Sequence, residues 1–253
     1  MGVPVLFLHH AGGGASDWSD IVEILGPAFE PLAIDLPGHG GRMLEEPLRD
    51  VAAMAVFAGR AARERWGRSG LVVGHSMGGA VALRLALDEP ETVSGLVLVS
   101  TAARLRVASA LLDLVREHFQ ELPQRMAPMG VAPSANPAVA ARWLAQPWSA
   151  SPAAALADFG ACDGCDLRPR LGEIGVPAVV MVGEQDFMTP VKRARELVEG
   201  MPRARLRVFP DAGHLLSWEK PAAVVEEIRA VASEVGLLPG GVGSSVGREE
   251  SAG

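Results

Sequence analysis

The sequence has only two cysteines, Cys162 and Cys165, among its 253 residues. Two thiols do not make the disulfide framework of a small secreted protein. Their spacing resembles half of a metal site or a redox pair, but no second pair of ligands accompanies them and they do not follow a strand. We therefore interpret them as ordinary structural cysteines and expect no metal.

Long apolar runs and an excess of positive charge are also missing, and no leader pattern is evident. No apolar run reaches roughly 18 residues, the length that a membrane-spanning helix needs. No basic segment followed by an apolar stretch precedes the first predicted strand, so we expect no signal peptide. The formal net charge is -7, and an acidic protein gains little from counterion release on a polyanion. We expect a cytoplasmic protein that has neither nucleic acid nor membrane as a partner.

What the sequence does contain is typical of a globular enzyme. Hydrophobic residues make up 49% of the chain and charged residues 21%, which argues against a mostly disordered protein. A chain of 253 residues suits one domain with room for an inserted subdomain.

Apolar runs without polar alternation recur along the chain and predict buried strands. They cover residues 3–8, 31–36, 71–74, 96–100, 176–182 and 206–209. Helical patterns separate them at residues 17–25, 48–66, 77–87, 190–199 and 221–235, the first capped by Ser16 or Asp17. This alternation predicts an α/β fold with a doubly wound, mostly parallel sheet whose ligands bind beyond the carboxyl ends of the strands.

One stretch, residues 103–167, has helical patterns but no strand. Helices are predicted over residues 105–121, 137–145 and 152–161, with prolines between them. We interpret this stretch as a helical cap inserted into a core formed by residues 1–102 and 168–235. Residues 236–253 are rich in Gly and Ser and are expected to be disordered.

The pentapeptide Gly74-His75-Ser76-Met77-Gly78 lies between a predicted strand and a predicted helix. In that setting a Gly-x-Ser-x-Gly sequence is a nucleophile elbow, a turn so tight that large side chains at the flanking glycines would collide. The turn strains the serine backbone and aims its hydroxyl away from the sheet. We predict that Ser76 is a nucleophile.

The order of motifs resembles the α/β-hydrolase family over nearly the whole chain. The turn at His9, the loop at residues 35–40, the Ser76 elbow, residues 183–186 and residues 212–214 follow the family order. The resemblance implies an α/β-hydrolase fold and a serine esterase or carboxylesterase activity without an organic cofactor. The family often begins with two antiparallel strands, for which Met1 leaves no room, so we expect either a trimmed fold or a truncated chain start.

A serine hydroxyl needs a base, and the base needs an acceptor that fixes its tautomer. His214 is the predicted base, because it follows a strand in a loop at the carboxyl edge of the sheet. Asp186 stands where the family places its acid. The rival carboxylates Asp163, Asp166 and Asp211 are weaker candidates. By resemblance, the backbone N–H groups of Ala11 and Met77 form the oxyanion hole.

Two departures from the family pattern affect this interpretation. The family usually has glycine where this chain has His10, which puts the oxyanion turn in question. The chain also has 0 tyrosines, whereas epoxide hydrolases of the family use cap tyrosines and an elbow aspartate, so that chemistry is excluded.

Apolar side chains of the predicted cap and of the motif loops are candidates for the substrate pocket. The cap contributes Phe119, Met126, Met129, Trp143, Trp148 and Phe159. The candidates for substrate contact are His10, Trp18, His75, Phe119, Met126, Trp143, Phe187 and Leu215. An apolar lid over the elbow favours a small to medium apolar acyl group, or an aromatic one.

Three functions remain open from the sequence. The first is hydrolysis of a small carboxylic ester through an acyl-enzyme, with the substrate and water as the only partners. The second uses the same triad on a carbon–carbon bond of a dienoic acid, a thioester or a lactone. Many carbon–carbon hydrolases of this type have Asn where this chain has His75, which disfavours that chemistry. The third is a ligand-binding protein without catalysis. The oligomeric state is not indicated.

Overall fold

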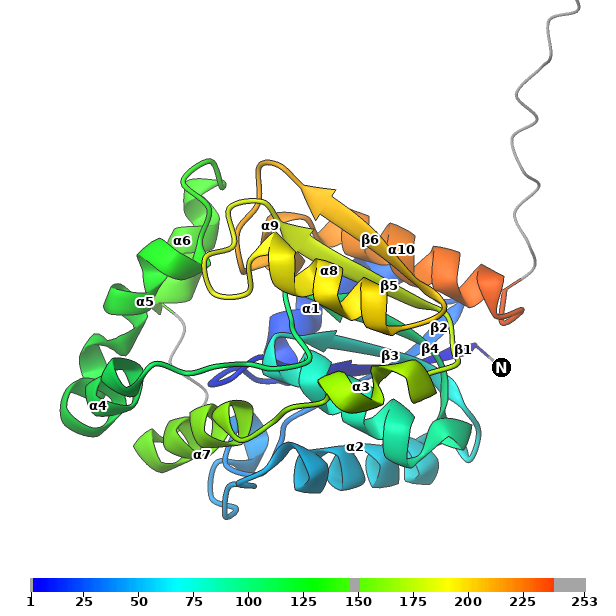
Figure 1. The fold of residues 1–253 in the computed structure, drawn as a ribbon, viewed down its shortest axis with the longest axis horizontal. Helices are drawn as coiled ribbons and strands as arrows, with labels where there is room; N and C mark the ends of the chain where they lie inside the picture. The colour runs from blue at the N-terminus through cyan, green and yellow to red at the C-terminus, as the bar shows by residue number, and fades with distance from the viewer. Residues whose placement is uncertain (1, 146–150, 239–253) are drawn as a thin grey trace, which may run out of the picture.

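A six-stranded sheet forms the centre of the molecule. The computed structural model describes residues 2–145 and 151–238. The strands are β1 (Val3–Leu8), β2 (Phe29–Ile34), β3 (Gly70–His75), β4 (Val93–Val99), β5 (Ala178–Gly183) and β6 (Ala204–Phe209). Their order is β2-β1-β3-β4-β5-β6, and all five pairings are parallel (Figure 1). The predicted parallel sheet is confirmed, and no antiparallel strand occurs among the residues described.

Helices cover both faces of the sheet, as the apolar strands require. On one face, α2 (Val51–Trp66), α3 (Met77–Asp88) and α8 (Val191–Gly200) pack into one buried cluster. On the other face, α1 (Ser19–Leu25), α9 (Leu216–Glu219) and α10 (Pro221–Glu234) join a second cluster. The layout is therefore doubly wound.

The sheet order places a topological switch point between β1 and β3. From β1 the chain passes to β2 on one side, and it then returns to β3 on the other side of β1. In parallel sheets, ligands bind in the crevice that such a reversal opens beyond the carboxyl ends of the strands. The loops that follow β1 and β3 begin at His9 and Ser76, so both predicted motifs lie at this crevice.

Among the described residues between β4 and β5 there are four α-helices and no strand. They are α4 (Ser109–His118), α5 (Leu122–Gly130), α6 (Pro137–Ala145) and α7 (Pro152–Asp163). Figure 1 shows them beyond the carboxyl ends of the strands, away from the N-terminus. With Leu215 and Trp218 they form a third apolar cluster. The helix predicted over residues 137–145 has the bounds of α6, and the other two predicted helices are present with shifted bounds. However, α5 was not predicted, and Trp148 lies outside the described residues.

Short 3-10 turns account for several remaining differences between the predicted and the observed elements. They span Ala15–Trp18, Gly40–Arg42, Pro90–Thr92, Phe119–Glu121 and Arg168–Glu173. The first of them replaces the predicted start of the helix at residue 17, so α1 begins only at Ser19. The predicted cap is wrong, because the Asp17 carboxylate turns back and accepts from Gly14 N at 2.9 Å.

Leu237 and Leu238 pack against the cluster of α1 and α10, so the tail is ordered through residue 238. The rest of the predicted disordered tail lies outside the described residues.

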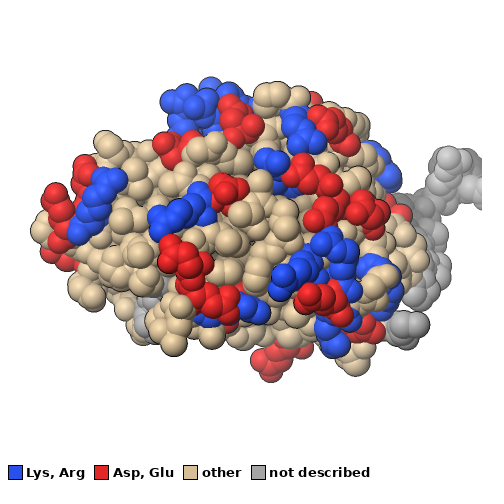
Figure 2. Space-filling model, turned by 90° about the horizontal axis from the view of Figure 1, so that it is seen from below, with Lys and Arg blue, Asp and Glu red and all other residues tan. Residues whose placement is uncertain are grey.

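In the described part of the chain, no helix is long and apolar enough to cross a bilayer. On the face in Figure 2, Lys and Arg side chains are interspersed with Asp and Glu side chains.

Candidate active site

Ser76 occupies the turn between β3 and α3 in a strained conformation. Its φ is 53° and its ψ is -113°, and Ser100 is the only other non-glycine residue with positive φ among those described. The backbone is anchored on both sides, because Ser76 N donates to Val99 O at 2.9 Å and Gly79 N donates to Ser76 O at 2.9 Å. Thr101 Oγ1 also donates to Ser76 O, at 2.6 Å. The predicted strain at the elbow is confirmed.

The two glycines of the pentapeptide are required by close backbone contacts. A Cβ on Gly74 would lie 2.2 Å from Gly78 O, and a Cβ on Gly78 would lie 2.1 Å from Leu8 O. Both distances are far below van der Waals contact, and backbone oxygens cannot move aside as a flexible side chain can. The absence of side chains therefore lets α3 start directly against the ends of β1 and β3.

His214 and Asp186 meet although they follow different strands. Asp186 comes after β5 and His214 after β6, and these neighbouring strands end at the same edge of the sheet. His214 Nδ1 lies 3.1 and 3.0 Å from the two carboxylate oxygens of Asp186. A Cβ on Gly183 would lie 2.1 Å from Ala212 O, so this glycine allows the two loops to approach.

The Asp186 carboxylate accepts further hydrogen bonds from its own loop. Met188 N and Thr189 N donate to Oδ1 at 2.9 and 2.8 Å, and Thr189 Oγ1 donates to Oδ2 at 2.7 Å. Burial by itself would raise the pKa of Asp186. The charge and hydrogen bond of His214, together with the Thr189 donors, outweigh burial and lower that pKa below its ordinary value. Asp186 is therefore an anion at neutral pH.

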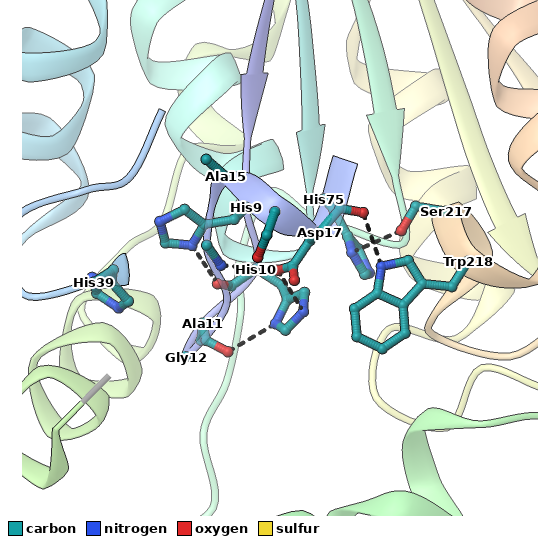
Figure 3. A network of polar contacts seen from close by, with 12 residues as sticks. His9, His10, Ala11, Gly12, Ala15, Asp17, His39, His75, Ser217 and Trp218 are labelled. Carbon is teal, nitrogen blue, oxygen red and sulfur yellow. Dashed lines mark hydrogen bonds and ion pairs between the residues drawn. The ribbon is translucent and has the colours of Figure 1, made fainter. Parts of the chain in front are cut away.

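His75 links the elbow to the loop of His214. His75 Nε2 lies 2.8 Å from His214 O, a carbonyl that can only accept, so this nitrogen carries the proton. Nδ1 faces Ser217 Oγ at 3.4 Å (Figure 3). Burial, and then the nearby His10 and His214, hold the pKa of His75 well below its usual value. A neutral His75 thus ties the residue before Ser76 to the predicted base.

The loop after β1 presents Ala11 beside the elbow. The left-handed residue of this loop is Gly12, with φ 74°, whereas His10 is not among the residues with positive φ. The missing glycine at position 10 is therefore no obstacle to the turn. Met77 begins α3, and the first N–H groups of a helix have no partner within it. Both predicted oxyanion donors belong to backbone that borders the crevice.

A cavity of about 290 Å³ lies between the elbow and the inserted helices. Of the predicted residues, those that line it are Ser76, His214, Ala11, Met126, Met129, Phe159 and Phe187. The remaining lining residues are Leu105, Arg106, Val107, Ala108, Leu111, Cys162, Met188 and Thr189. The cavity wall is therefore mostly apolar and combines the hydroxyl of Ser76 with the imidazole of His214.

The other predicted substrate residues are not among those that line this cavity. Trp18 is buried in the sheet core against Phe7, with ring centroids 5.1 Å apart. Trp143 and Leu215 are buried in the cluster of the inserted helices, and Phe119 packs against that cluster. The rings of His10 and His75 contact each other, with their centroids 5.1 Å apart.

Several residues of the site were not predicted from the sequence. Thr189 bonds Asp186 and lies 3.2 Å from His214 Nδ1, and its only signal was its place three residues after an aspartate. Arg106 lines the cavity without any motif around it, and Cys162 lines it although its spacing from Cys165 indicated no role in the site. Both cysteines are free and buried, and burial raises the pKa of Cys162 well above its usual value and that of Cys165 to about 11. They are protonated thiols rather than nucleophiles at neutral pH.

Comparison with known proteins places the chain in a family. Residues 5–227 match the model of the alpha/beta hydrolase family. A pimeloyl-[acyl-carrier protein] methyl ester esterase of Nitrosomonas europaea is 32% identical over 84% of this chain and 89% of its own length. A 2-hydroxy-6-oxo-6-phenylhexa-2,4-dienoate hydrolase of Comamonas testosteroni is 28% identical over 87% of this chain and 84% of its own length.

Solved structures agree with the sequence relatives. A thermophilic esterase from Thermogutta terrifontis is 27% identical, with a TM-score of 0.82 over 93% of this chain and 91% of that chain. A second thermophilic esterase is 29% identical, with a TM-score of 0.78 over 92% and 90% of the two chains. The chain belongs to the alpha/beta hydrolase family, and its relatives support a hydrolase of the esterase type.

Proposed function

We propose that the protein is a carboxylic-ester hydrolase that forms an acyl-enzyme on Ser76. The observation that carries this proposal is the cavity that contains both Ser76 and His214, with Asp186 bonded behind His214. The proposal assigns Ser76 as nucleophile, His214 as base and Asp186 as the acceptor that orients the imidazole. The esterases among the relatives support it.

The reaction proceeds in two halves. His214 Nε2 takes the proton of Ser76 Oγ as that oxygen attacks the ester carbonyl, and Asp186 stabilises the imidazolium. The oxygen of the tetrahedral intermediate accepts from the N–H groups of Ala11 and Met77. His214 then protonates the departing alcohol, which leaves an acyl-Ser76 ester. Water, deprotonated by His214, attacks this ester, and Ser76 Oγ departs with the proton as the acid is released.

The cavity suggests the class of ester. Its apolar wall and its volume of about 290 Å³ match a small to medium acyl chain or an aromatic group rather than a large lipid. The described residues contain no cluster of three or more potential metal ligands, and the proposed steps use none. The cytoplasmic location suggested by the sequence stays a prediction.

A second candidate is hydrolysis of a carbon–carbon bond in a dienoic acid. Arg106 is a cation on the cavity wall. Such a guanidinium is placed to bind a substrate carboxylate, and one relative is a dienoate hydrolase. Three results together would favour this function over ester hydrolysis. The parent would cleave a 2-hydroxy-6-oxo-dienoate rapidly, Arg106→Gln would slow that cleavage, and p-nitrophenyl esters would not react.

The deciding experiment compares the parent protein with Ser76→Ala. We expect the parent to hydrolyse p-nitrophenyl esters of two to eight carbons and to bind one fluorophosphonate per chain. Ser76→Ala should lose on the order of 10⁶ in kcat and all labelling. A parent that neither turns over nor labels contradicts the enzyme assignment and leaves the ligand-binding function. Full activity of Ser76→Ala contradicts the site.

A further inference from the structure

The peptide group that carries the Ala11 N–H is held from its opposite end. Its carbonyl belongs to His10 and accepts two hydrogen bonds, from His9 Nδ1 at 2.8 Å (Figure 3) and from Gly13 N at 3.0 Å. Donors on a carbonyl orient the peptide plane, and they also polarise the N–H of the same peptide. The direction and donor strength of Ala11 N–H therefore depend on His9 and Gly13.

The next peptide group is fixed at both of its ends. The Ala11 carbonyl lies 2.9 Å from His10 Nδ1, which must carry the proton because a carbonyl can only accept. Gly12 N donates to Asp158 Oδ2 at 2.8 Å. Asp158 belongs to α7 of the inserted helices, so a residue 146 positions away anchors the oxyanion loop.

Asp158 is a fully buried carboxylate whose partner is His39. Its Oδ2 lies 2.9 Å from His39 Nε2, while Nδ1 of the same ring lies 3.2 Å from Pro37 O. Because both ring nitrogens face oxygen acceptors, both carry protons and the ring is an imidazolium. Burial would lower the pKa of His39, but the contact with Asp158 outweighs burial and raises it. The charge of Asp158 is thereby balanced inside the protein.

His9 is the neutral member of the same group. Its Nε2 accepts from Leu36 N at 3.2 Å, so its proton is on Nδ1 and points to His10 O. Burial, and then the neighbouring charge of His39, lowers the pKa of His9 to about 4. The rings of His9 and His39 lie 4.8 Å apart. One charged and one neutral histidine thus have separate tasks at this loop.

We propose that Asp158 is a positioning residue for the oxyanion hole, which it holds through Gly12 N with His39 as its counter-charge. The inserted helices then do more than line the cavity, because α7 supplies an anchor without which the Ala11 donor is displaced. The inference rests on the proposed function, since it gives Asp158 a role in stabilising the tetrahedral intermediate.

A purely structural role predicts different observations. If Asp158 only joins α7 to the core, its loss lowers stability but leaves the turnover of each folded active site unchanged. If Asp158 positions the oxyanion donor, its loss lowers kcat while KM stays the same, because the donor acts on the transition state. Binding of a trifluoromethyl ketone, which forms a tetrahedral adduct on the serine, then weakens in parallel with kcat/KM.

The experiment uses Asp158→Ala, Asp158→Asn and the double variant Asp158→Asn/His39→Gln, with active sites counted by fluorophosphonate. We expect Asp158→Ala to lower kcat by about 10- to 100-fold, less than the loss of an oxyanion donor itself, with KM within about threefold. Asp158→Asn keeps one acceptor oxygen and should lower kcat less than Asp158→Ala does. The double variant also removes the uncompensated charge of His39 and should recover part of the lost kcat.

Gly160→Ala is the matched control, because Gly160 lies on the same helix, is exposed, and has no atom within 4 Å of its Cβ position. It should leave kcat within about twofold. Suppose that the parent is active and that Asp158→Ala keeps its kcat and its ketone affinity per active site. That result overturns the proposal while the ester hydrolase stands. If the alanine variant does not fold, the same result with Asp158→Asn overturns it. If the parent lacks activity, both assignments fail together.

Discussion

At the scale of single residues, Asp186 is held by more donors than an ion pair with His214 requires. Four donors converge on its two oxygens: His214 Nδ1, the amides of Met188 and Thr189, and the Thr189 hydroxyl. This set keeps the carboxylate ionised despite its burial, and it leaves the carboxylate only one orientation toward the imidazole. The tautomer of His214 therefore depends on a loop that the sequence marks only by an aspartate.

We expect Asp186→Asn to lower kcat by roughly 10⁴-fold, because an amide cannot stabilise the imidazolium and favours the wrong tautomer. Thr189→Val should cost far less, about tenfold, since the two amides still hold the carboxylate. Steady-state kinetics on a p-nitrophenyl ester measures both losses. Equal losses in the two variants would contradict the assignment of Asp186 as the acceptor.

At the scale of elements, the position of Ser76 depends on how closely α3 packs against β1 and β3. The predicted bounds of these elements were nearly correct, because apolar strands, tight glycines and helix formers are local signals. Helix α5 was not predicted, because Pro123 and Pro128 suggested a break between helices. Pro123 lies in the first turn, where its missing N–H costs nothing, so that proline starts a helix rather than ending one.

Gly78→Ala tests this packing directly. The added methyl group would lie 2.1 Å from Leu8 O, so we expect a loss of about 3 kcal/mol in the free energy of unfolding or failure to fold. Gly160→Ala in α7 is the control, because no atom lies within 4 Å of its Cβ position. It should be neutral or stabilise the protein by up to about 1 kcal/mol. Urea unfolding curves measure both, and a Gly78→Ala protein as stable as the parent would contradict the close contact.

At the scale of the whole molecule, buried histidines make stability depend on pH. His9 and His75 have lowered pKa values in the folded protein, so the unfolded chain takes up their protons first as the pH falls below about 6.5. His39 acts in the opposite direction. Its contribution to the free energy of unfolding is fully present below about pH 6.5 and is lost as the pH rises through its raised pKa. Asp186 contributes to the free energy of unfolding above about pH 3.8, and this contribution is lost as the pH falls through its lowered pKa.

We therefore expect the free energy of unfolding to fall as the pH is lowered from about 6.5 to 4. A shift of the His9 pKa from 6.5 to about 4 corresponds to a loss on the order of 3 kcal/mol. Urea unfolding at several pH values measures this slope, and His9→Asn should reduce it whatever that variant's stability at neutral pH. Stability that stays level across this range would contradict a neutral, buried His9.

The sequence by itself determined the parallel sheet, the elbow at Ser76 and the order of the motifs that include Asp186 and His214. These depend on local backbone geometry, on apolar periodicity and on glycines where no side chain fits. Only the tertiary structure decided that Arg106 and Cys162 line the cavity, that Trp18 belongs to the core, and that Asp158 holds Gly12. The reason is physical, since contacts between different elements, such as that between Asp158 and Gly12 at a separation of 146 residues, arise from how whole elements pack, and no local pattern records them.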